Sequence, residues 1–502
     1  MFFQFWWGDH DWGYIKDGVS LESGFFEARY TQHLFTVLLL DGHVLPIFSF
    51  IISIISLVVL NMMIAYYLEV PKTKFNYILF VLFFSLNPHV YAFFYYVYLA
   101  FPFIAWCIVG VGILFLFEKQ SLIRFLIGVV LFVLLFGSYP PNITLFFVLF
   151  VAKRIIAFLD NRESILDIIK KGCLFALEIV FGYIGFKCIF IFLQKNDLIN
   201  LDMYNISTKG IYEILQTVPL EMWYSIAQWF EPYSFMDDNY CVCLIIPIVL
   251  AMFLMFCSVK NKFFVILFWA FILFLSRFVF LIATKGEVSA FRLVYFGKIG
   301  VLAFALSIIM QNKEKCIKNI LMLWGCVCLS LFVETNFYIH KVQYLGFVAG
   351  RKYQHKLLDK LVMNKNFKYE KKYISLTFGY PNFRNKFYNG TKNSGEMNGQ
   401  TMVFYFDTIN QLFWEEKFAP VAVGAGILNS ASILRVNRDG GKYWGNDEYW
   451  TNNPENMKNI REWLYMKAKL GSVYIDDKYI LAILDENDFY KNRELVATSL
   501  DK

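Results

Sequence analysis

A pair of carboxylates near the start of the chain is the first feature that could do chemistry. Asp9 and Asp11 lie in the stretch WGDHDWGY, residues 7–14, which follows an apolar opening. Tryptophan and tyrosine are typical of a membrane–water interface. Partial loss of water there raises the pKa of a carboxyl group toward that of a general base. The pair is therefore either a catalytic base or a solvated acidic loop.

Three cations lie near the ends of apolar runs and are candidates to bind phosphate. Arg29 lies in the first polar segment, and Lys285 and Arg292 flank the connection at 284–292. An arginine side chain binds a phosphate group through two parallel hydrogen bonds. The alternatives are an interface anchor for Arg29, which lies in a helical pattern over 26–39, and pairing of Arg292 with Glu287 or with phospholipid.

Two further segments contain candidate substrate contacts. The turn GSYPPN at 137–142 is stiffened by two prolines, and the connection 195–240 is unusually long. Long ordered connections are often functional, although a plain turn is the alternative for the first segment. Two adjacent carboxylates are weak evidence for a metal, so we expect no cofactor and leave a divalent cation as the alternative. The candidate substrate contacts are Tyr139, Asn142, Glu221, Asp237 and Asp238.

Composition shows what must position these residues. The chain has 502 residues, of which 58% are hydrophobic, 20% aromatic and 17% charged. Soluble domains are less apolar and carry roughly 25% charged residues, so a disordered or ordinary soluble protein is excluded. Residues 341–502 hold 24 Lys and Arg and 18 Asp and Glu, about half of all charges in a third of the chain. We therefore expect a membrane domain over 1–340 and a soluble domain over 341–502.

Apolar runs of about 20 residues predict membrane-spanning helices. One of them, at 77–94, is interrupted by Asn87-Pro88, so it is either a kinked span or a half-helix over 77–87 followed by a re-entrant piece. The expected fold is an all-α polytopic membrane domain with ten spans, at roughly 44–68, 77–94, 97–117, 121–137, 142–159, 172–194, 241–259, 263–283, 291–310 and 317–339.

The basic residues of the connections predict the orientation. Alternate connections, from 70–76 to 311–318, carry 14 Lys and Arg in 46 residues, whereas the other set carries 6 in 114. By the positive-inside rule the first set is cytoplasmic, and the segments 1–43, 195–240 and 341–502 lie outside. The same rule explains the net charge of +7 without a nucleic-acid partner. Because residues 1–43 must cross the membrane, we expect a further apolar helix upstream of Met1.

The soluble domain reads as a small α/β or α+β fold. Alternating runs at 372–378, 401–406, 432–436 and 472–484 predict strands, and 470–484 predicts a hairpin around Asp476-Asp477-Lys478. No catalytic cluster is visible there. All nine cysteines precede residue 330, inside or beside apolar runs, where they serve as small apolar side chains.

The order of these features resembles one family. An acidic first loop around Asp9 and Asp11, the Glu27-Ala28-Arg29 segment, the Tyr139 turn and a final hairpin are similar to GtrII-type glucosyltransferases, which belong to the GT-C superfamily of membrane glycosyltransferases. The chain departs from the family pattern where His10 separates the two aspartates and Ala28 replaces glycine. These departures leave open which aspartate is essential.

The resemblance implies transfer of a sugar, glucose in the first instance, from a polyprenyl-phosphate donor to a cell-surface glycan such as O-antigen. The site would face outward from the bacterial cytoplasmic (inner) membrane. One aspartate would deprotonate the acceptor hydroxyl, and Arg29, Lys285 and Arg292 would hold the donor phosphate. The alternatives are a flippase or transporter of lipid-linked sugar, an O-antigen polymerase or ligase, and a non-catalytic assembly protein.

Overall fold

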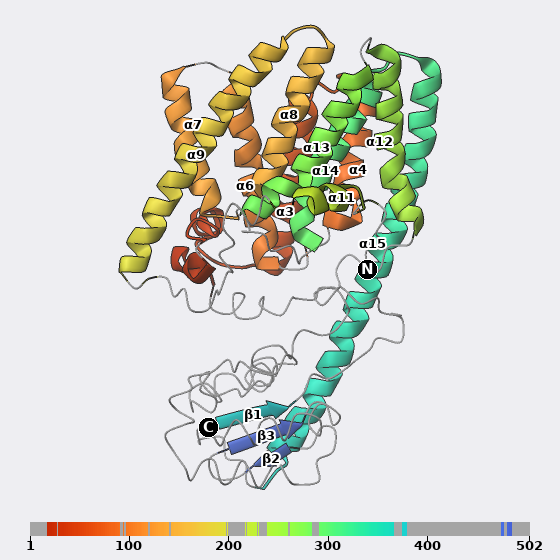
Figure 1. The fold of residues 1–502 in the computed structure, drawn as a ribbon. Helices are drawn as coiled ribbons and strands as arrows, with labels where there is room; N and C mark the ends of the chain where they lie inside the picture. Colours follow the sequence, from red (N-terminus) through yellow and green to blue (C-terminus); the bar gives the residue numbers. More distant parts are fainter. Residues whose placement is uncertain are drawn as a thin grey trace. The chain divides into compact units, whose positions relative to one another are not determined.

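A computed structural model gives the fold (Figure 1). Two compact units share the chain: one holds Gly13–Ile339, and the other holds Met1–Trp12 with most of the charged C-terminal part from His340. The structure describes residues 18–27, 29–90, 94, 97–118, 121–139, 142–196, 198, 216, 218–227, 229, 238–259, 262–283, 291–365, 374–378, 473–475 and 479–483.

A helix lies at each of the ten places where an apolar run predicts one. Within the described residues, four of them are long and apolar enough to cross a membrane: α3, residues 98–117 of α6, α9, and residues 315–337 of α15. The helices are α3 (Pro46–Tyr67), α4 (Lys74–Leu86), α6 (Val97–Phe117), α7 (Leu122–Phe136), α8 (Ile143–Leu159), α9 (Ile165–Lys195), α12 (Asp238–Ser258), α13 (Lys262–Ala283), α14 (Phe291–Gln311) and α15 (Lys315–Val362).

The outward faces of these helices are apolar. Leu122, Ile123 and Leu126 on α7 are each more than half exposed, and Leu166, Ile169 and Phe192 on α9 are as well. Exposed apolar surface of this extent requires lipid around it. The largest buried side chains include Trp106 of α6 and Trp269 of α13. The first unit is therefore a helical membrane protein with an inner core of its own.

The expected span at 77–94 is not one continuous helix. Helix α4 ends at Leu86, Asn87 is extended with ψ 123°, and a short 3-10 helix, η2 (Pro88–Val90), follows. Proline disfavours the helical conformation of the residue before it, so Asn87 must end the helix. Thirteen residues of helix rise only about 20 Å, less than the hydrocarbon core of a bilayer. The break after the half-helix is confirmed, whereas the re-entrant piece that would follow it stays a prediction.

Two other expectations about helices need correction. The pattern at 26–39 forms two short pieces, η1 (Leu21–Glu27) and α2 (Leu34–Leu40), rather than one interfacial helix. The polar residues between them turn inward, because hydrogen bonds to α6 and α7 compete with continuation of the helix. Near the C-terminal end of this unit, the helix expected to end at residue 339 continues without a break to Val362 as α15.

Three strands are described in the second unit. β1 (Ile374–Phe378) pairs in parallel with β3 (Tyr479–Ile483), and β3 pairs antiparallel with β2 (Val473–Ile475). The antiparallel pair confirms the two strands of the predicted hairpin, with Ile475 opposite Ile480. The runs at 401–406 and 432–436 lie outside the described residues, so the α/β class of this domain stays a prediction.

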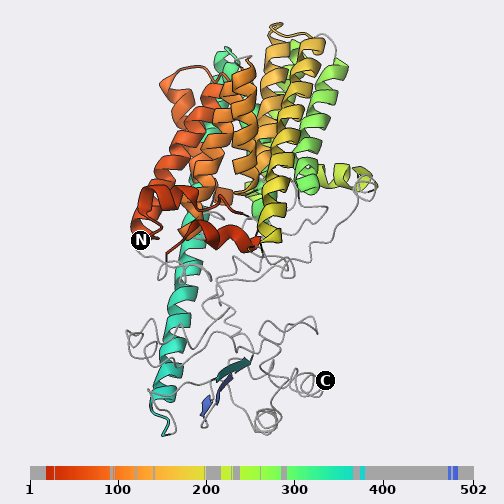
Figure 2. The ribbon, with the colours of Figure 1, turned by 90° about the vertical axis from the view of Figure 1, so that its left-hand side faces the viewer.

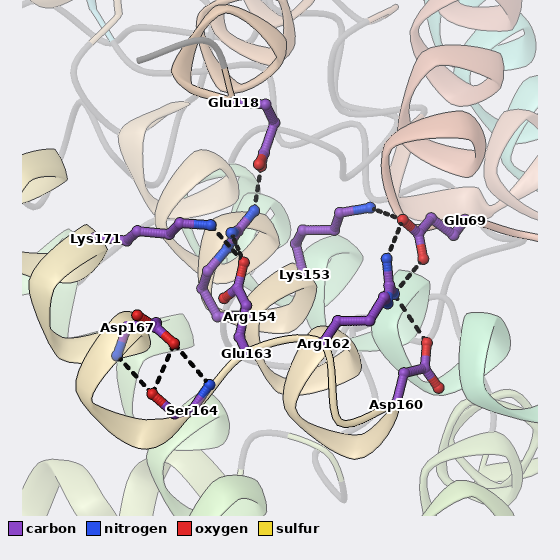
Figure 3. Close-up of polar contacts among 10 residues, drawn as sticks. All are labelled: Glu69, Glu118, Lys153, Arg154, Asp160, Arg162, Glu163, Ser164, Asp167 and Lys171. Carbon is purple, nitrogen blue, oxygen red and sulfur yellow. Dashed lines mark hydrogen bonds and ion pairs between the residues drawn. The ribbon is translucent and has the colours of Figure 1, made fainter.

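The basic connections meet at one end of the helical unit (Figures 1 and 2). Glu69 after α3 accepts hydrogen bonds from Lys153 of α8 at 2.5 Å and from Arg162 at 2.5 and 2.8 Å. The largely buried Arg154 pairs with Glu118 and, at 2.5 Å, with Glu163, as Figure 3 shows. These ion pairs tie together the ends of α3, α6 and α8 and the start of α9.

Local sequence explains why α9 begins at this end. Ser164 caps the helix by accepting from the backbone N–H of Asp167, and the Asp167 carboxylate accepts from the backbone N–H of Ser164. This reciprocal capping box satisfies two donors that a helix start leaves open. The helix therefore starts at a fixed residue beside the ion pairs, which Figure 3 shows in the same view.

A buried ion pair joins α7 to α9 further along. Arg124 donates to Glu178 at 2.5 Å, and the Glu178 side chain is fully buried. Gly128 of α7 makes room, because an added Cβ there would lie 1.4 Å from the Glu178 carboxylate oxygen. A charge inside an apolar helix is tolerated when it is paired. Glu178 therefore acts here as a link between two helices.

Candidate functional site

A short polar segment is docked at the other end of the bundle, where α7 ends. The backbone N–H of Thr31 donates to the carbonyl oxygen of Gly137 at 2.8 Å, and the Thr31 hydroxyl donates to Leu134 at 2.5 Å. The indole N–H of Trp106 donates to the Thr31 carbonyl oxygen at 3.0 Å. Each bond uses a backbone group that a helix end or a loop would otherwise leave open.

Glycine at the end of α7 lets this segment approach closely. The ring of Tyr30 lies over Gly137, where an added Cβ would be 2.6 Å from ring carbons. The Tyr30 hydroxyl donates to the carbonyl oxygen of Val133 at 3.3 Å. Burial raises the pKa of Tyr30 well above its usual value, so it stays protonated and keeps donating at neutral pH. The segment is held rigidly enough to position the residue before it.

Arg29 directly precedes this segment, and its side chain lies over the ring of Tyr139. The Arg29 guanidinium carbon lies 5.0 Å from the centre of the Tyr139 ring, and its Nη1 donates to Gln32 Oε1 at 3.4 Å. The Tyr139 ring stacks on Phe103 with centroids 4.4 Å apart and contacts Phe296 of α14 at 6.1 Å. The negative face of an aromatic ring attracts a cation electrostatically. Tyr139 and Gln32 therefore fix the position of the Arg29 guanidinium.

Asn142 lies one turn away, at the start of α8. Its backbone N–H donates to the carbonyl oxygen of Tyr139 at 3.1 Å. Its side chain is fully buried, and neither the amide nitrogen nor the amide oxygen has a hydrogen-bond partner among the described residues. An unsatisfied buried amide is costly and is normally paired in a working protein. Asn142 is therefore the described polar side chain best suited to receive a ligand or an ordered water.

The other predicted residues are placed only in part. Arg292, Glu221 and Asp238 lie in α14, in α11 (Val218–Ala227) and at the first residue of α12, and their side chains are outside the described part of the structure. Asp9, Asp11, Lys285 and Asp237 lie outside the described residues. Of the predicted site residues, the structure thus brings together Arg29, Tyr139 and Asn142.

Metal ligands do not cluster in the described part of the chain. No group of three or more His, Cys, Asp or Glu side chains there could hold a metal ion. The pair Asp237-Asp238 lies outside that search, so the alternative of a divalent cation is untested. What the described geometry can offer is cation and amide chemistry suited to an anion and to hydroxyl groups.

Two contacts between cations and aromatic rings were not predicted from the sequence. Lys298 of α14 lies 5.4 Å from the centre of the Trp229 ring, and Arg277 of α13 lies 5.2 Å from that of Tyr224 in α11. Both cations stand out in the sequence as charges inside apolar runs, which is the signal that could have marked them. Their aromatic partners come from the long connection 195–240, and nothing local in the sequence specifies which cation each ring meets.

Comparison of the chain with protein-family models, with curated proteins and with solved structures finds no match in any of the three.

Proposed function

We propose that the protein is a membrane glycosyltransferase. It moves a sugar, glucose in the first instance, from a polyprenyl-phosphate donor to a cell-surface glycan such as O-antigen. The reaction takes place at the outer face of the bacterial cytoplasmic membrane, where the C-terminal domain also lies. A lipid-borne donor suits that face because nucleotide sugars are confined to the cytoplasm.

The observation that carries the proposal is the group formed by Arg29, Tyr139 and Asn142. It combines a cation fixed on a ring with a buried amide that lacks partners in the described structure. A cation suits a phosphate, and an amide that both donates and accepts suits the hydroxyl groups of a sugar. The group lies at the end of the bundle opposite the basic connections, which is the outer end by the positive-inside rule.

The chemistry needs a base and a way to neutralise the leaving group. Asp9 or Asp11 takes the proton from the acceptor hydroxyl as its oxygen attacks the anomeric carbon of the donor sugar. The bond from that carbon to the phosphate oxygen breaks, and its electron pair leaves with the lipid phosphate. Arg29, Lys285 and Arg292 stabilise the charge on that phosphate, while Tyr139, Asn142, Glu221, Asp237 and Asp238 contact the substrates. No cofactor takes part.

A transporter of lipid-linked sugar is the main alternative, and it needs polar groups along a path through the membrane. The buried carboxylate of Glu178 is instead engaged with Arg124. This contact supports a role in joining helices, which favours the transferase proposal.

The test measures turnover and donor affinity separately. Purified protein is given polyprenyl-phosphate glucose and an acceptor glycan, as wild type and as Asp9→Asn, Asp11→Asn and Arg292→Ala. Loss of the base should lower turnover by about 10²–10⁴-fold with donor affinity retained. Arg292→Ala should mainly weaken donor binding. Near wild-type turnover in both aspartate variants would contradict the assignment of Asp9 or Asp11 as the base.

A further inference from the structure

Five lysines form a surface of one charge at the end of the helical unit that carries the basic connections. They come from 70–76, where α4 begins, and from 311–318, where α15 begins, and both stretches are fully described. Glu314 is the one acidic residue in these two stretches, which leaves them a net charge of +4. No carboxylate among the described residues pairs with the lysines. This lysine surface consists of Lys72, Lys74, Lys313, Lys315 and Lys318, all of them exposed.

Next to the lysine surface, cations and carboxylates are matched. Glu69 accepts hydrogen bonds from Lys153 and Arg162, and Glu163 pairs with Arg154. The pieces of this end outside the described residues, 119–120 and 260–261, contain no acidic residue. The positive-inside rule requires cations on this side, but it does not require one part to be matched and the next to stay positive. The lysine surface therefore suits an anion that comes from outside the chain.

The two connections that supply the lysines adjoin each other. Gln311, the last residue of α14, donates from Nε2 to the carbonyl oxygen of Leu68 at 3.3 Å. Helices α4 and α15, which follow these connections, pack together, and the ring centroids of Phe83 and Trp324 are 5.1 Å apart. The lysines at the starts of the two helices therefore belong to one surface.

Lys74 and Lys318 lie at nearly the same depth. A Cβ added to Gly325 of α15 would lie 2.7 Å from the side chain of Leu79 in α4, so the helices touch at this level. Lys74 comes five residues before Leu79, and Lys318 comes seven residues before Gly325. At a rise of 1.5 Å per residue, both lysines are about 8–10 Å from the contact and on the same side of it.

Lipid borders this surface along α4 and α15. Ile78 of α4 and Leu323 of α15 are each more than half exposed, and Phe75 beside Lys74 is exposed as well. Exposed apolar side chains next to the lysines require acyl chains around them. The lysines are thus at the level of lipid headgroups, and a cluster of about four to eight basic residues beside a span is typical of binding to anionic lipid.

We propose that the lysine surface binds the headgroup of an anionic phospholipid of the same leaflet. Lys74 and Lys318 contact the phosphate, and the other three lysines add to the positive potential around it. The acyl chains lie along Ile78 and Leu323. Because one lipid then contacts the starts of both α4 and α15, its binding stabilises the packing of these helices. The proposal is independent of the transfer reaction, which is placed at the opposite end of the bundle.

The experiment titrates lipid against the whole purified protein in detergent and follows binding by native mass spectrometry. Phosphatidylglycerol is the anionic probe, phosphatidylcholine with the same acyl chains is the zwitterionic probe, and pyrophosphate is the soluble one. The test variant is Lys74→Gln/Lys318→Gln. The control, Lys170→Gln/Lys262→Gln, removes the same charge at the same end, because Lys170 lies in α9 and Lys262 donates to carbonyl oxygens at the end of α12. Melting temperatures without lipid show that each variant is folded.

Each lysine near a membrane surface contributes about fivefold to the binding of an anionic lipid, so the test variant should bind phosphatidylglycerol about 30-fold more weakly. The control should keep the wild-type affinity, and phosphatidylcholine should bind all three proteins equally. Phosphatidylglycerol should raise the melting temperature of the wild type and the control more than that of the test variant.

Three results would overturn the proposal. The first is wild-type affinity for phosphatidylglycerol in the folded test variant. The second is an equal loss of affinity in the test variant and the control, because net charge rather than the lysine surface would then decide binding. The third is tighter binding of pyrophosphate than of phosphatidylglycerol, because the occupant would then be a soluble phosphate.

Discussion

Different contacts are described for the cations at the two ends of the helical unit. At the end that carries the basic connections, cations meet carboxylates: Arg154 pairs with Glu118 and Glu163, and Glu69 with Lys153 and Arg162. At the other end, Arg29, Arg277 and Lys298 lie on the rings of Tyr139, Tyr224 and Trp229. Aromatic rings hold a cation in place without neutralising it.

This difference separates charged groups that stabilise the bundle from polar groups that can bind a substrate. Ion pairs that join helix ends stabilise the bundle and keep their charges from a ligand. The buried amide of Asn142 has no hydrogen-bond partner among the described residues, so it can donate to or accept from a sugar hydroxyl. Substitutions at the paired end should therefore change stability, and substitutions at the other end should change binding and turnover.

The largest expected effect on stability is at Arg154. Its replacement by methionine removes one of the two cations that pair with the largely buried Glu163, and Lys171 at 2.6 Å remains. Removal of one member of a buried ion pair costs about 3–5 kcal/mol when the other charge is left alone, and because Lys171 stays beside Glu163 we expect the lower end of this range. The matched control is Arg162→Met, because the Arg162 side chain is 44% exposed and an exposed pair is worth about 0–1 kcal/mol. Thermal unfolding in detergent compares the two, and equal melting temperatures would contradict the ranking.

Next in size is the close contact of α13 with α14. Gly297→Ala forces a Cβ against the backbone of Ser276, which must move, at a cost of about 1–3 kcal/mol. Gly112→Ala in α6 is the control, since a Cβ there meets nothing within 4 Å and should gain up to about 1 kcal/mol of helix propensity. Melting temperatures should move in opposite directions. A fall of the melting temperature by the same amount in both variants would contradict the close contact of Gly297 with the backbone of Ser276.

A smaller effect is expected from pH at Glu69. Burial alone would raise the pKa of this carboxyl group, but hydrogen bonds from Arg162 and Lys153 outweigh it and lower the pKa from 4.5 to about 2. A lowered pKa gives stability that is present above pH 4.5 and is lost as the pH falls toward 2. The melting temperature of Glu69→Gln should therefore depend less on pH in this window than that of the wild type. An equal dependence of the melting temperature on pH in Glu69→Gln and in the wild type would contradict the pairing of Glu69 with Arg162 and Lys153.

Local signals in the sequence predicted the helices but not the contacts between them. Apolar runs located ten helices, and Asn87-Pro88 marked the break after α4, because both depend on neighbouring residues. The contact of Arg154 with Glu118 and that of Lys298 with Trp229 join positions far apart in the chain, and nothing local specifies them. Residue type alone indicated Arg29, Tyr139 and Asn142 as members of the candidate site. Their arrangement depends on how Thr31 docks on α7, which no pattern shows.

The most direct test of the contrast between the two ends is Asn142→Leu, measured for sugar transfer and for melting temperature in the same preparation. Leucine has nearly the same shape and removes an amide that has no partner in the described structure, so stability should stay the same or rise. If Asn142 is kept for the substrate, turnover should fall about tenfold or more, as for the loss of a buried hydrogen bond to a ligand. Wild-type turnover together with a lowered melting temperature would contradict the account, because Asn142 would then serve the fold alone.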